Sequence, residues 1–293
     1  MLIGLEACSG AHDWARRCRE HGPAVRLRPP QFVKPSVKAH KNDRRDAEAM
    51  AEAVTRPTRR FVPIKSVAQH DIQARHRVRT RLLKARTALM NETRGLLHDY
   101  GLVVPPGALT FRQHVLATVA ANEAKLTPMS QALFQPLEEE LAAIEERLAR
   151  DDAQLTRLAR RHPVCQRLMT IPGLGEVTAT ALVAAVSDAA PCNNGRQFAA
   201  WLGLVPRQHR SGGQSRLLGI SKRGDMSRRT RLVHGARSGL RWVDRQRDRR
   251  SPWARSLLER RGWHRAAVAL ATKKARVAWV LLRTDQVYGA AHV

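Results

Sequence analysis

The chain has 293 residues, with 52 Lys and Arg against 25 Asp and Glu, so its formal net charge at pH 7 is +27. An excess of this size points to a polyanionic partner, because each Lys or Arg that meets a phosphate displaces a condensed counterion. The longest apolar runs, 179–186 and 277–282, are too short to span a bilayer and argue against a membrane partner.

The first residues carry no signal-peptide pattern, so we expect a cytoplasmic, nucleoid-associated protein. The cysteines form no CxxC pair, which argues against zinc and disulfides and predicts reduced, mostly buried thiols. They are Cys8, Cys18, Cys165 and Cys192.

The N-terminal part of the chain predicts a small α/β unit. Residues 2–5 and 24–27 suit short buried strands, and 14–21 between them fits a helix that Gly22 closes. A strand–helix–strand order favours parallel pairing. A further helix is expected over 43–55, with one apolar face formed by Ala47, Met50, Ala51 and Val54.

A long basic helix is expected over residues 66–100. Six cations fall within residues 75–86 and repel one another unless a polyanion lies alongside, which favours nucleic-acid contact over a merely solvated face. The apolar stripe is Ile72, Val78, Leu82, Ala85 and Leu89, and the cations are Arg75, Arg77, Arg79, Arg81, Lys84 and Arg86.

After a break at residues 101–106, a heptad seam begins beyond Pro128. The seam spans only three to four heptads. A helical hairpin with residues 66–100 and a coiled coil between two chains are therefore both compatible with it. The seam consists of Leu133, Leu137, Leu141, Ile144, Leu148, Leu155 and Leu158.

The C-terminal third is extremely basic. Residues 207–276 hold 21 Lys and Arg against 4 Asp and Glu, so the positive charge forms a localised patch. Just before it, Gly173 and Gly175 allow a tight turn between two helices. The turn looks like a helix–hairpin–helix element, whose backbone N–H groups contact DNA phosphates without reading bases. The alternative is an ordinary turn between two core helices.

Two groups of residues can carry chemistry. Ser211 offers a hydroxyl on a glycine-backed loop ringed by arginines, which suits attack on a phosphate, although serine is also a common turn residue. Upstream, Glu6 and the pair Asp43 and Asp46 are carboxylates of the kind that hold divalent metal for phosphoryl transfer. Most such triples are only surface charge, and Asp43 alone would stabilise a helix start.

Seven segments carry a resemblance to a known family: 3–10 (IGLEACSG), 29–31 (PPQ), 41–49 (KNDRRDAEA), 171–175 (IPGLG), 200–207 (AWLGLVPR), 211–213 (SGG) and 220–224 (ISKRG). In this order, over nearly the whole chain, they resemble the DEDD-type transposases of the insertion-sequence one-ten family, and most closely its eleven-eleven subgroup.

The resemblance implies three domains. Residues 1–64 would be part of a RuvC-like (RNase H-type) α/β domain, residues 65–160 a linker made of the basic helix and a coiled coil, and residues 161–293 a helical transposase domain. The fold class is thus an α/β N-terminal remnant followed by a mostly α-helical chain.

The resemblance also implies the site. Glu6, Asp43 and Asp46 would be the second, third and fourth members of a tetrad that binds Mg²⁺ or Mn²⁺, and Ser211 the nucleophile that forms a transient covalent link to DNA. The implied partners are double-stranded DNA at the element ends and the target, a structured guide RNA from the element, and further copies of the chain in a homodimer or homotetramer. The predicted phosphate ligands are Arg207, Arg210, Lys222 and Arg223, with the backbone at Gly173 and Gly175.

One departure from the family pattern concerns the first carboxylate of the tetrad. In the family it lies on an opening strand well before the glutamate, whereas Glu6 is here the sixth residue. We therefore expect a start farther upstream or a truncated copy, and a partial sheet with unpaired edges. Two alternatives to a working transposase are a remnant that only binds nucleic acid and a metal-dependent junction nuclease, which would not need Ser211.

Overall fold

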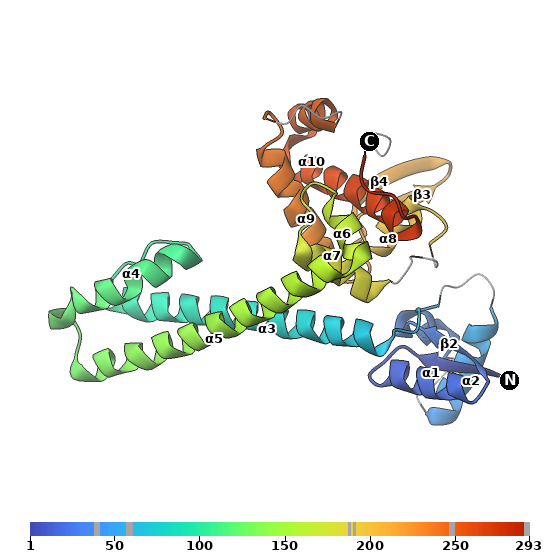
Figure 1. Ribbon diagram of the computed structural model, residues 1–293, viewed down its shortest axis with the longest axis horizontal. Coiled ribbons are helices and arrows are strands. Elements are labelled where there is room, and N and C mark those ends of the chain that lie inside the picture. Colours follow the sequence, from blue (N-terminus) through green and yellow to red (C-terminus); the bar gives the residue numbers. More distant parts are fainter. Residues whose placement is uncertain (38–41, 57–60, 187–188, 190–191, 246–249, 290–293) are drawn as a thin grey trace. The chain divides into compact units, whose positions relative to one another are not determined.

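The computed structural model describes residues 1–37, 42–56, 61–186, 189, 192–245 and 250–289. The chain forms two compact units, one made of Met1–His70 with Pro163–Val293 and the other of Asp71–His162. Most described residues are helical, and the strands form two small two-stranded sheets (Figure 1). The mostly helical character expected beyond the N-terminal residues is thus confirmed.

The N-terminal sheet consists of strands β1 (Leu2–Glu6) and β2 (Ala24–Arg28), with helix α1 (Ala11–Glu20) between them in the chain. The strands run parallel, with Ile3 opposite Val25 in the register, which confirms the expected strand–helix–strand unit. The core described beneath this sheet is small, and its buried members are Ala11, Ala15, Val25 and Leu27.

The outer edge of β2 is extended by one antiparallel bridge between Leu27 and Val62. Within the described ranges, β1 pairs with no strand other than β2. The short 3-10 turns η1 (Pro30–Phe32) and η2 (Lys34–Ser36) then lead towards α2.

Helix α2 (Asp43–Thr55) has the predicted bounds. It starts where the side chain of Asn42 accepts a hydrogen bond from the backbone N–H of Arg45, which satisfies one of the free donors of the first turn. The predicted apolar face is partly wrong, because Ala47 and Ala51 are exposed. The buried residues are Ala49, Ala53 and Val54. Lys41 of the motif lies outside the described residues.

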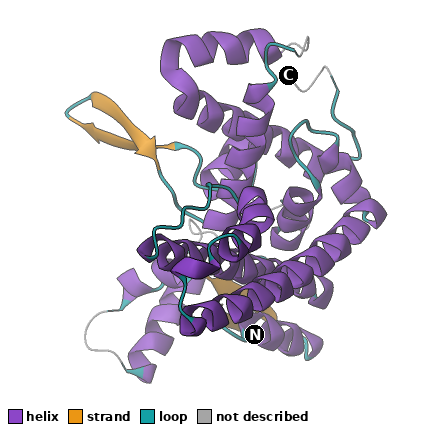
Figure 2. Cartoon of the chain, turned by 90° about the vertical axis from the view of Figure 1, so that its left-hand side faces the viewer, coloured by secondary structure: helices purple, strands orange, loops and turns teal. Residues whose placement is uncertain are grey.

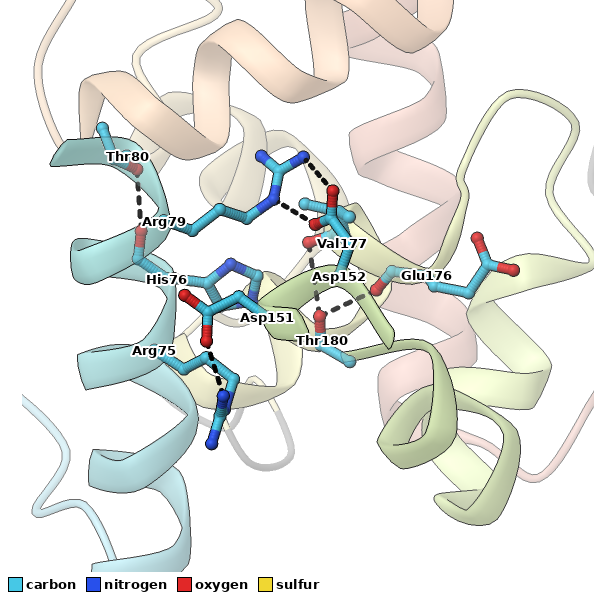
Figure 3. Close-up of polar contacts among 9 residues, drawn as sticks. All are labelled: Arg75, His76, Arg79, Thr80, Asp151, Asp152, Glu176, Val177 and Thr180. Atoms are coloured by element: carbon cyan, nitrogen blue, oxygen red, sulfur yellow. Dashed lines mark hydrogen bonds and ion pairs between the residues drawn. The ribbon is translucent and has the colours of Figure 1, made fainter. Parts of the chain in front are cut away.

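The second unit is a helical hairpin. Helices α3 (Val67–Asp99) and α5 (Pro128–Arg161) are joined through α4 (Ala108–Ala120) and the turn η3 (Glu123–Lys125). The early part of α3 meets the late part of α5, so the two helices are antiparallel. Arg75 Nη1 lies 2.6 Å from Asp151 Oδ1, and Arg79 Nη2 donates to Asp152 Oδ2 at 3.2 Å (Figure 3).

A shared apolar cluster joins the three helices of this unit, and the described chain therefore forms the hairpin within one molecule. Its buried members include Leu82, Leu89 and Leu97 from α3, Phe111 and Val115 from α4, and Phe134, Leu141, Ile144 and Leu148 from α5.

Two members of the predicted stripes are wrong. Val78 is 41% exposed and Leu133 is 44% exposed, whereas His76 and Phe134 are buried. The other members of both stripes are buried or half-buried as predicted, so the seams deviate only locally, where His76 and Phe134 are buried in place of Val78 and Leu133. The cations of α3 are also less repulsive than expected, since Arg75 and Arg79 face aspartates of α5.

The C-terminal part of the first unit is built around a buried helix. Residues 178–185 of α7 are all buried, and α10 packs against α6, α8 and α9. A break at Gly262, with φ 73° and ψ 168°, divides α10 into two segments. The elements are α6 (Pro163–Met169), α7 (Glu176–Ala185), α8 (Gly195–Trp201), β3 (Pro206–Ser211), β4 (Gln214–Ile220), α9 (Met226–Arg241) and α10 (Arg250–Arg283).

The cysteines follow the expectation in part. Cys165 and Cys192 are buried, but Cys8 is exposed. Burial raises the pKa of the Cys165 thiol to about 12, so this thiol stays protonated at neutral pH. In the described part of the chain, no helix has the length and apolar composition needed to cross a membrane.

Candidate nucleic-acid interface and nucleophile

Ser211 lies at the tip of a β-hairpin and not on an irregular loop. Strands β3 and β4 pair antiparallel, and Ser211 stands opposite Gln214 across a two-residue turn. The turn residues Gly212 and Gly213 have φ values of 53° and 81°. Two consecutive positive φ values define the type I′ turn that matches the twist of a hairpin, and glycine adopts them without strain.

The hairpin is a solvent-exposed arm. Every residue of β3 is exposed, and so is every residue of β4 except Ile220. Figure 2 shows the hairpin extending away from the neighbouring helices. Within the described ranges, no hydrogen bond or ion pair occupies the Ser211 side chain. Its hydroxyl is therefore accessible to a large ligand.

The register assigns neighbours to Ser211. Successive residues of a strand point to opposite faces, and directly paired residues share a face. Ser211 therefore shares its face with the pair His209 and Arg216, which stand opposite each other two positions along β3. This face combines the hydroxyl with an imidazole and a guanidinium.

Arg210 lies on the opposite face of the arm, opposite Ser215 in the register. The hydrogen bond from Gln208 Nε2 to Ser215 Oγ, at 3.0 Å, runs along this second face. Arg207 lies at the register irregularity between Pro206 and Gln208. The arginine nearest to Ser211 on its own face is thus Arg216, which the sequence pattern did not single out.

The three serines of this region differ in accessibility. Ser215 Oγ accepts the hydrogen bond from Gln208, and Ser221 Oγ is buried without a hydrogen-bond partner in the described part of the chain. Only Ser211 combines an exposed position with an unoccupied hydroxyl, and the geometry therefore favours it over its two neighbours as a nucleophile.

The base of the arm is held by a backbone clasp between residues 201–205 and 221–225. Ser221 N donates to Val205 O at 2.8 Å, and Lys222 N donates to Gly203 O at 3.2 Å. A Cβ on Gly203 would overlap the carbonyl oxygen of Arg223, and a Cβ on Gly224 would overlap that of Trp201. Glycine is therefore required at both positions, which explains why the segments 200–207 and 220–224 belong together.

Replacing Gly224 by alanine should destabilise the clasp. The residue has φ 79°, where an L side chain is strained, and the new methyl group would meet the Trp201 carbonyl. We expect a loss of about 2 kcal/mol or more in the free energy of unfolding, measured from urea denaturation. The matched control is Gly219→Ala, since nothing lies within 4 Å of that Cβ position. Equal stability of the two variants would contradict the clasp.

Two predicted phosphate ligands lie on the clasp. The side chains of Lys222 and Arg223 are exposed and make no hydrogen bond or ion pair within the described ranges. Lys222 has φ 53°, a conformation uncommon for a side chain other than glycine. Their positions keep both cations available to an anion near the base of the arm.

The turn around Gly173, which resembles a helix–hairpin–helix element in sequence, packs against α9 on one side and is exposed on the other. Helices α6 and α7 flank the turn as expected, and Gly173 has φ 81°. Cβ atoms on Gly173 and Gly235 would each overlap the carbonyl oxygen of the other residue, so the turn packs closely on α9. The glycine at 173 thus has a packing reason besides any phosphate contact.

The side chain of Lys274 stabilises this contact between Gly173 and Gly235. The side chain is only 3% exposed, and its ammonium donates to Gly235 O at 2.7 Å. Gly175, in contrast, has nothing within 4 Å of its Cβ position and caps α7 without a side-chain bond. The N-terminus of α7 beside Gly175 is therefore the part of this element that is open to a phosphate.

The three carboxylates do not form a cluster. Glu6 ends β1 opposite Arg28, and Asp43 and Asp46 lie in the first turn of α2. Among the described residues, no three His, Cys, Asp or Glu side chains are grouped as a metal ion requires. The helix-start interpretation of Asp43 agrees with this placement.

Sequence reasoning overlooked Arg216 and the hairpin itself. The signal was present in part, because two consecutive glycines between short polar segments are typical of a type I′ hairpin turn. The sequence contains no comparable indication that Lys274 is buried, since a lysine on a basic helix resembles any solvated cation.

Known proteins are similar to this chain over nearly its whole length. A family model described as transposase, IS116/IS110/IS902 family, matches residues 165–257, which include the turn at Gly173, the clasp and the arm. The chain is 48% identical over 288 residues to a probable family 20 transposase of Pseudomonas aeruginosa, covering 98% of this chain and 85% of that protein.

Two further relatives are named for insertion sequences. The transposase for insertion sequence element IS1111A of Coxiella burnetii is 45% identical over 286 residues, covering 98% of this chain and 79% of that protein. The transposase for insertion sequence element IS1328 of Yersinia enterocolitica is 37% identical over 287 residues, covering 98% and 85%.

Proposed function

This chain belongs to the IS116/IS110/IS902 family of transposases and is a transposase of an insertion sequence, and we propose that it cuts and rejoins DNA through a covalent intermediate at Ser211. The observation that carries this proposal is the exposed hydroxyl at the tip of a basic arm. Neither neighbouring serine combines exposure with an unoccupied hydroxyl.

In the proposed first step, Ser211 Oγ attacks the phosphorus of a phosphodiester. An Oγ–P bond forms, one bridging P–O bond breaks, and the released strand end leaves as a hydroxyl that takes up a proton. The serine proton passes to solvent or to His209, which shares the face of Ser211. In the second step the hydroxyl of another strand end attacks the same phosphorus and restores Ser211. Bond energy is conserved, so no nucleotide hydrolysis is needed.

Arg216 would stabilise the transition state of both steps. Charge accumulates on the non-bridging oxygens as phosphorus becomes five-coordinate, and a guanidinium on the same face offers two parallel donors. Arg210 on the opposite face would contact neighbouring phosphates and contribute to binding only. Lys222, Arg223 and Arg207 would hold the DNA backbone at the base of the arm.

The matched pair Arg216→Gln and Arg210→Gln tests this assignment, because both variants lose one charge on the same arm. Loss of a transition-state donor costs about a hundredfold in rate, so we expect that loss in adduct formation for Arg216→Gln alone. Adduct formation is measured by single-turnover assays on labelled DNA. Equal rates in the two variants would contradict the assignment of the faces.

We also propose that Glu6, Asp43 and Asp46 contribute ligands to Mg²⁺ or Mn²⁺. Carboxylate oxygens suit these hard cations. The residues as placed do not form a site, however, since the described part of the chain groups no three such side chains. No step of the chemistry above is therefore assigned to a metal.

Metal binding by the 293-residue chain is accordingly expected to be weak, with a dissociation constant on the order of 10⁻³ M or higher. Titration with Mn²⁺, followed by electron paramagnetic resonance, measures it. The triple variant Glu6→Gln, Asp43→Asn and Asp46→Asn should bind more weakly still, because it loses the proposed ligands. Tight, stoichiometric binding that the triple variant loses would show that the carboxylates do converge.

The partners follow the same reasoning. DNA is the partner that a transposase requires, and the local excess of cations between residues 207 and 276 suits its backbone. A structured guide RNA and assembly into a homodimer or homotetramer are further parts of the proposal. The formal net charge of +27 supports a polyanionic partner such as RNA besides DNA, and the assembly follows from the resemblance to the family.

Strand-transfer products distinguish the proposal from its two rivals. A purified chain incubated with element-end DNA should give joined strands and a serine-linked intermediate. Nucleic-acid binding without either product indicates a remnant that only binds. Cleavage products without any covalent adduct indicate a nuclease that uses water as its nucleophile.

A further inference from the structure

A hollow between α8 and α10 lies apart from the arm and its clasp. Its volume is about 800 Å³, and it lies between the start of α8 and both segments of α10. This volume falls within the range of roughly 300 to 1,000 Å³ that is typical of small-molecule sites. We call it the α8–α10 pocket.

The pocket carries a concentrated positive charge. Arg196, Lys273 and Arg276 line it, and no Asp or Glu is among its lining residues. Arg196 and Arg276 are exposed, and neither guanidinium forms an ion pair or hydrogen bond with the part of the chain that the structure describes. Cations that converge on a hollow with apolar walls raise the local potential, so the pocket favours an anion.

Aromatic rings supply the walls. Trp253 lies on the first segment of α10 and Lys273 on the second. The Lys273 ammonium is 4.8 Å from the centroid of the Trp253 ring. The indole of Trp279 is fixed because its N–H donates to Cys192 O at 2.9 Å. The pocket thus presents flat, oriented apolar surfaces beside the exposed guanidinium groups of Arg196 and Arg276.

The close approach of α8 to α10 is built into the sequence. A Cβ on Gly195 would lie 3.0 Å from the Cα and the carbonyl oxygen of Arg276, so glycine lets the two helices meet at the floor of the pocket. Arg196, the neighbour of Gly195, and Arg276 both line the pocket. The pocket is therefore a consequence of packing and not of a variable loop.

A ligand that suits this pocket has a planar apolar part and at least one negative charge. A nucleotide has both, because its base can stack on an indole and its phosphate can meet guanidinium groups. We propose that the α8–α10 pocket binds one unpaired nucleotide of a DNA strand, with the base against Trp253 and the phosphate at Arg196 and Arg276. This assignment rests on the proposed DNA chemistry, which separates strands during exchange.

Binding of a fluorescein-labelled oligothymidylate of twelve nucleotides tests the pocket. Base stacking on one aromatic side chain changes affinity roughly five- to a hundredfold or more, so Trp253→Leu should weaken binding by a factor in that range. The same variant should bind an abasic oligonucleotide of equal length, and a blunt duplex, as the parent does. Arg276→Gln should weaken the binding of the oligothymidylate and of the abasic strand alike, by about threefold or more.

Matched controls come from outside the pocket. Trp242 also lies beside a cation, with the Arg245 guanidinium 4.9 Å from its ring centroid, and it is exposed, whereas Trp253 is half-buried. Arg283 is exposed at the end of α10, outside the basic stretch 207–276. Trp242→Leu and Arg283→Gln should leave oligothymidylate binding within twofold. Should Trp253→Leu melt early, the comparison of Arg276→Gln with Arg283→Gln decides, because both replace an exposed side chain.

Pocket variants that bind oligothymidylate as the controls do would overturn the proposal. The proposal would also be overturned if Trp253→Leu lowered the affinity for duplex and single-stranded DNA equally, or if it lowered the affinity for oligouridylate RNA alone. Failure of the parent to bind any DNA would instead refute the proposed function. Covalent adducts at Ser211, combined with unaffected pocket variants, would leave that function intact and remove only the pocket.

Discussion

Ser211→Ala is expected to abolish covalent protein–DNA adducts and to lower strand transfer by a factor on the order of 10⁵ or more. The reason is chemical, since alanine offers no atom that can form the phosphoester. DNA affinity should change by no more than a few-fold, because one hydroxyl contributes little beside the many phosphate contacts of the basic patch. Denaturing gels of labelled element-end DNA measure adducts, and anisotropy measures affinity.

Two serines of the same hairpin region serve as controls for this result. Ser215→Ala removes a hydroxyl from the opposite face of the arm, and Ser221→Ala removes a buried one. Both variants should keep forming adducts. Adducts that survive in Ser211→Ala and vanish in Ser221→Ala would identify the wrong hydroxyl in our proposal and would place the nucleophile at the clasp.

The second large effect concerns salt. Each neutralised phosphate of a duplex contributes roughly −0.9 to the slope of log affinity against log salt concentration. A surface that makes about six to ten such contacts loses on the order of 10³ to 10⁵ in affinity between 50 and 200 mM salt. The basic stretch 207–276, with 21 Lys and Arg, can supply that many contacts. Anisotropy of a labelled duplex over a salt series measures the slope.

Single neutralisations give the salt result residue by residue. Lys222→Gln should reduce the slope by about one unit, because its exposed ammonium would meet one phosphate. Lys125→Gln is the control, since Lys125 is an equally exposed lysine outside the basic stretch. Without RNA, binding should show little sequence preference. A flat salt dependence, or strong selectivity by the protein alone, would mean that the patch reads bases directly.

Local patterns predicted the secondary structure well where short-range signals agree. The helical pattern over residues 43–55 predicts the bounds of α2, and the structure adds Asn42 as the cap. The parallel pairing of β1 and β2 follows from the helix between them. The faces of the helices were less certain. Val78 and Leu133 belong to apolar lines adjacent to the buried ones, and only the partner helix decides which line is covered.

The site depended on contacts that are distant in sequence. Gly173 faces Gly235 and Lys274, and Gly203 faces the Arg223 carbonyl, so the motif glycines have partners tens of residues away or across the clasp. A single sequence shows that these glycines are present but not what approaches them. The face of Ser211 is different, because the turn at Gly212 and Gly213 would have fixed the register, and with it Arg216, from sequence alone.

The exposed arm also has a thermodynamic consequence. A two-stranded ribbon without other cover is only marginally stable, and local opening of such a segment needs far less free energy than unfolding of the domain. The clasp closes this opening at residues 203 and 222, so the fluctuation stays within the arm. In the proposed function, ordering of the arm would coincide with DNA engagement, and binding energy from remote phosphates would offset the lost conformational entropy. A short DNA that fills the catalytic phosphate but not the flanking ones would accordingly bind a disordered arm and react slowly.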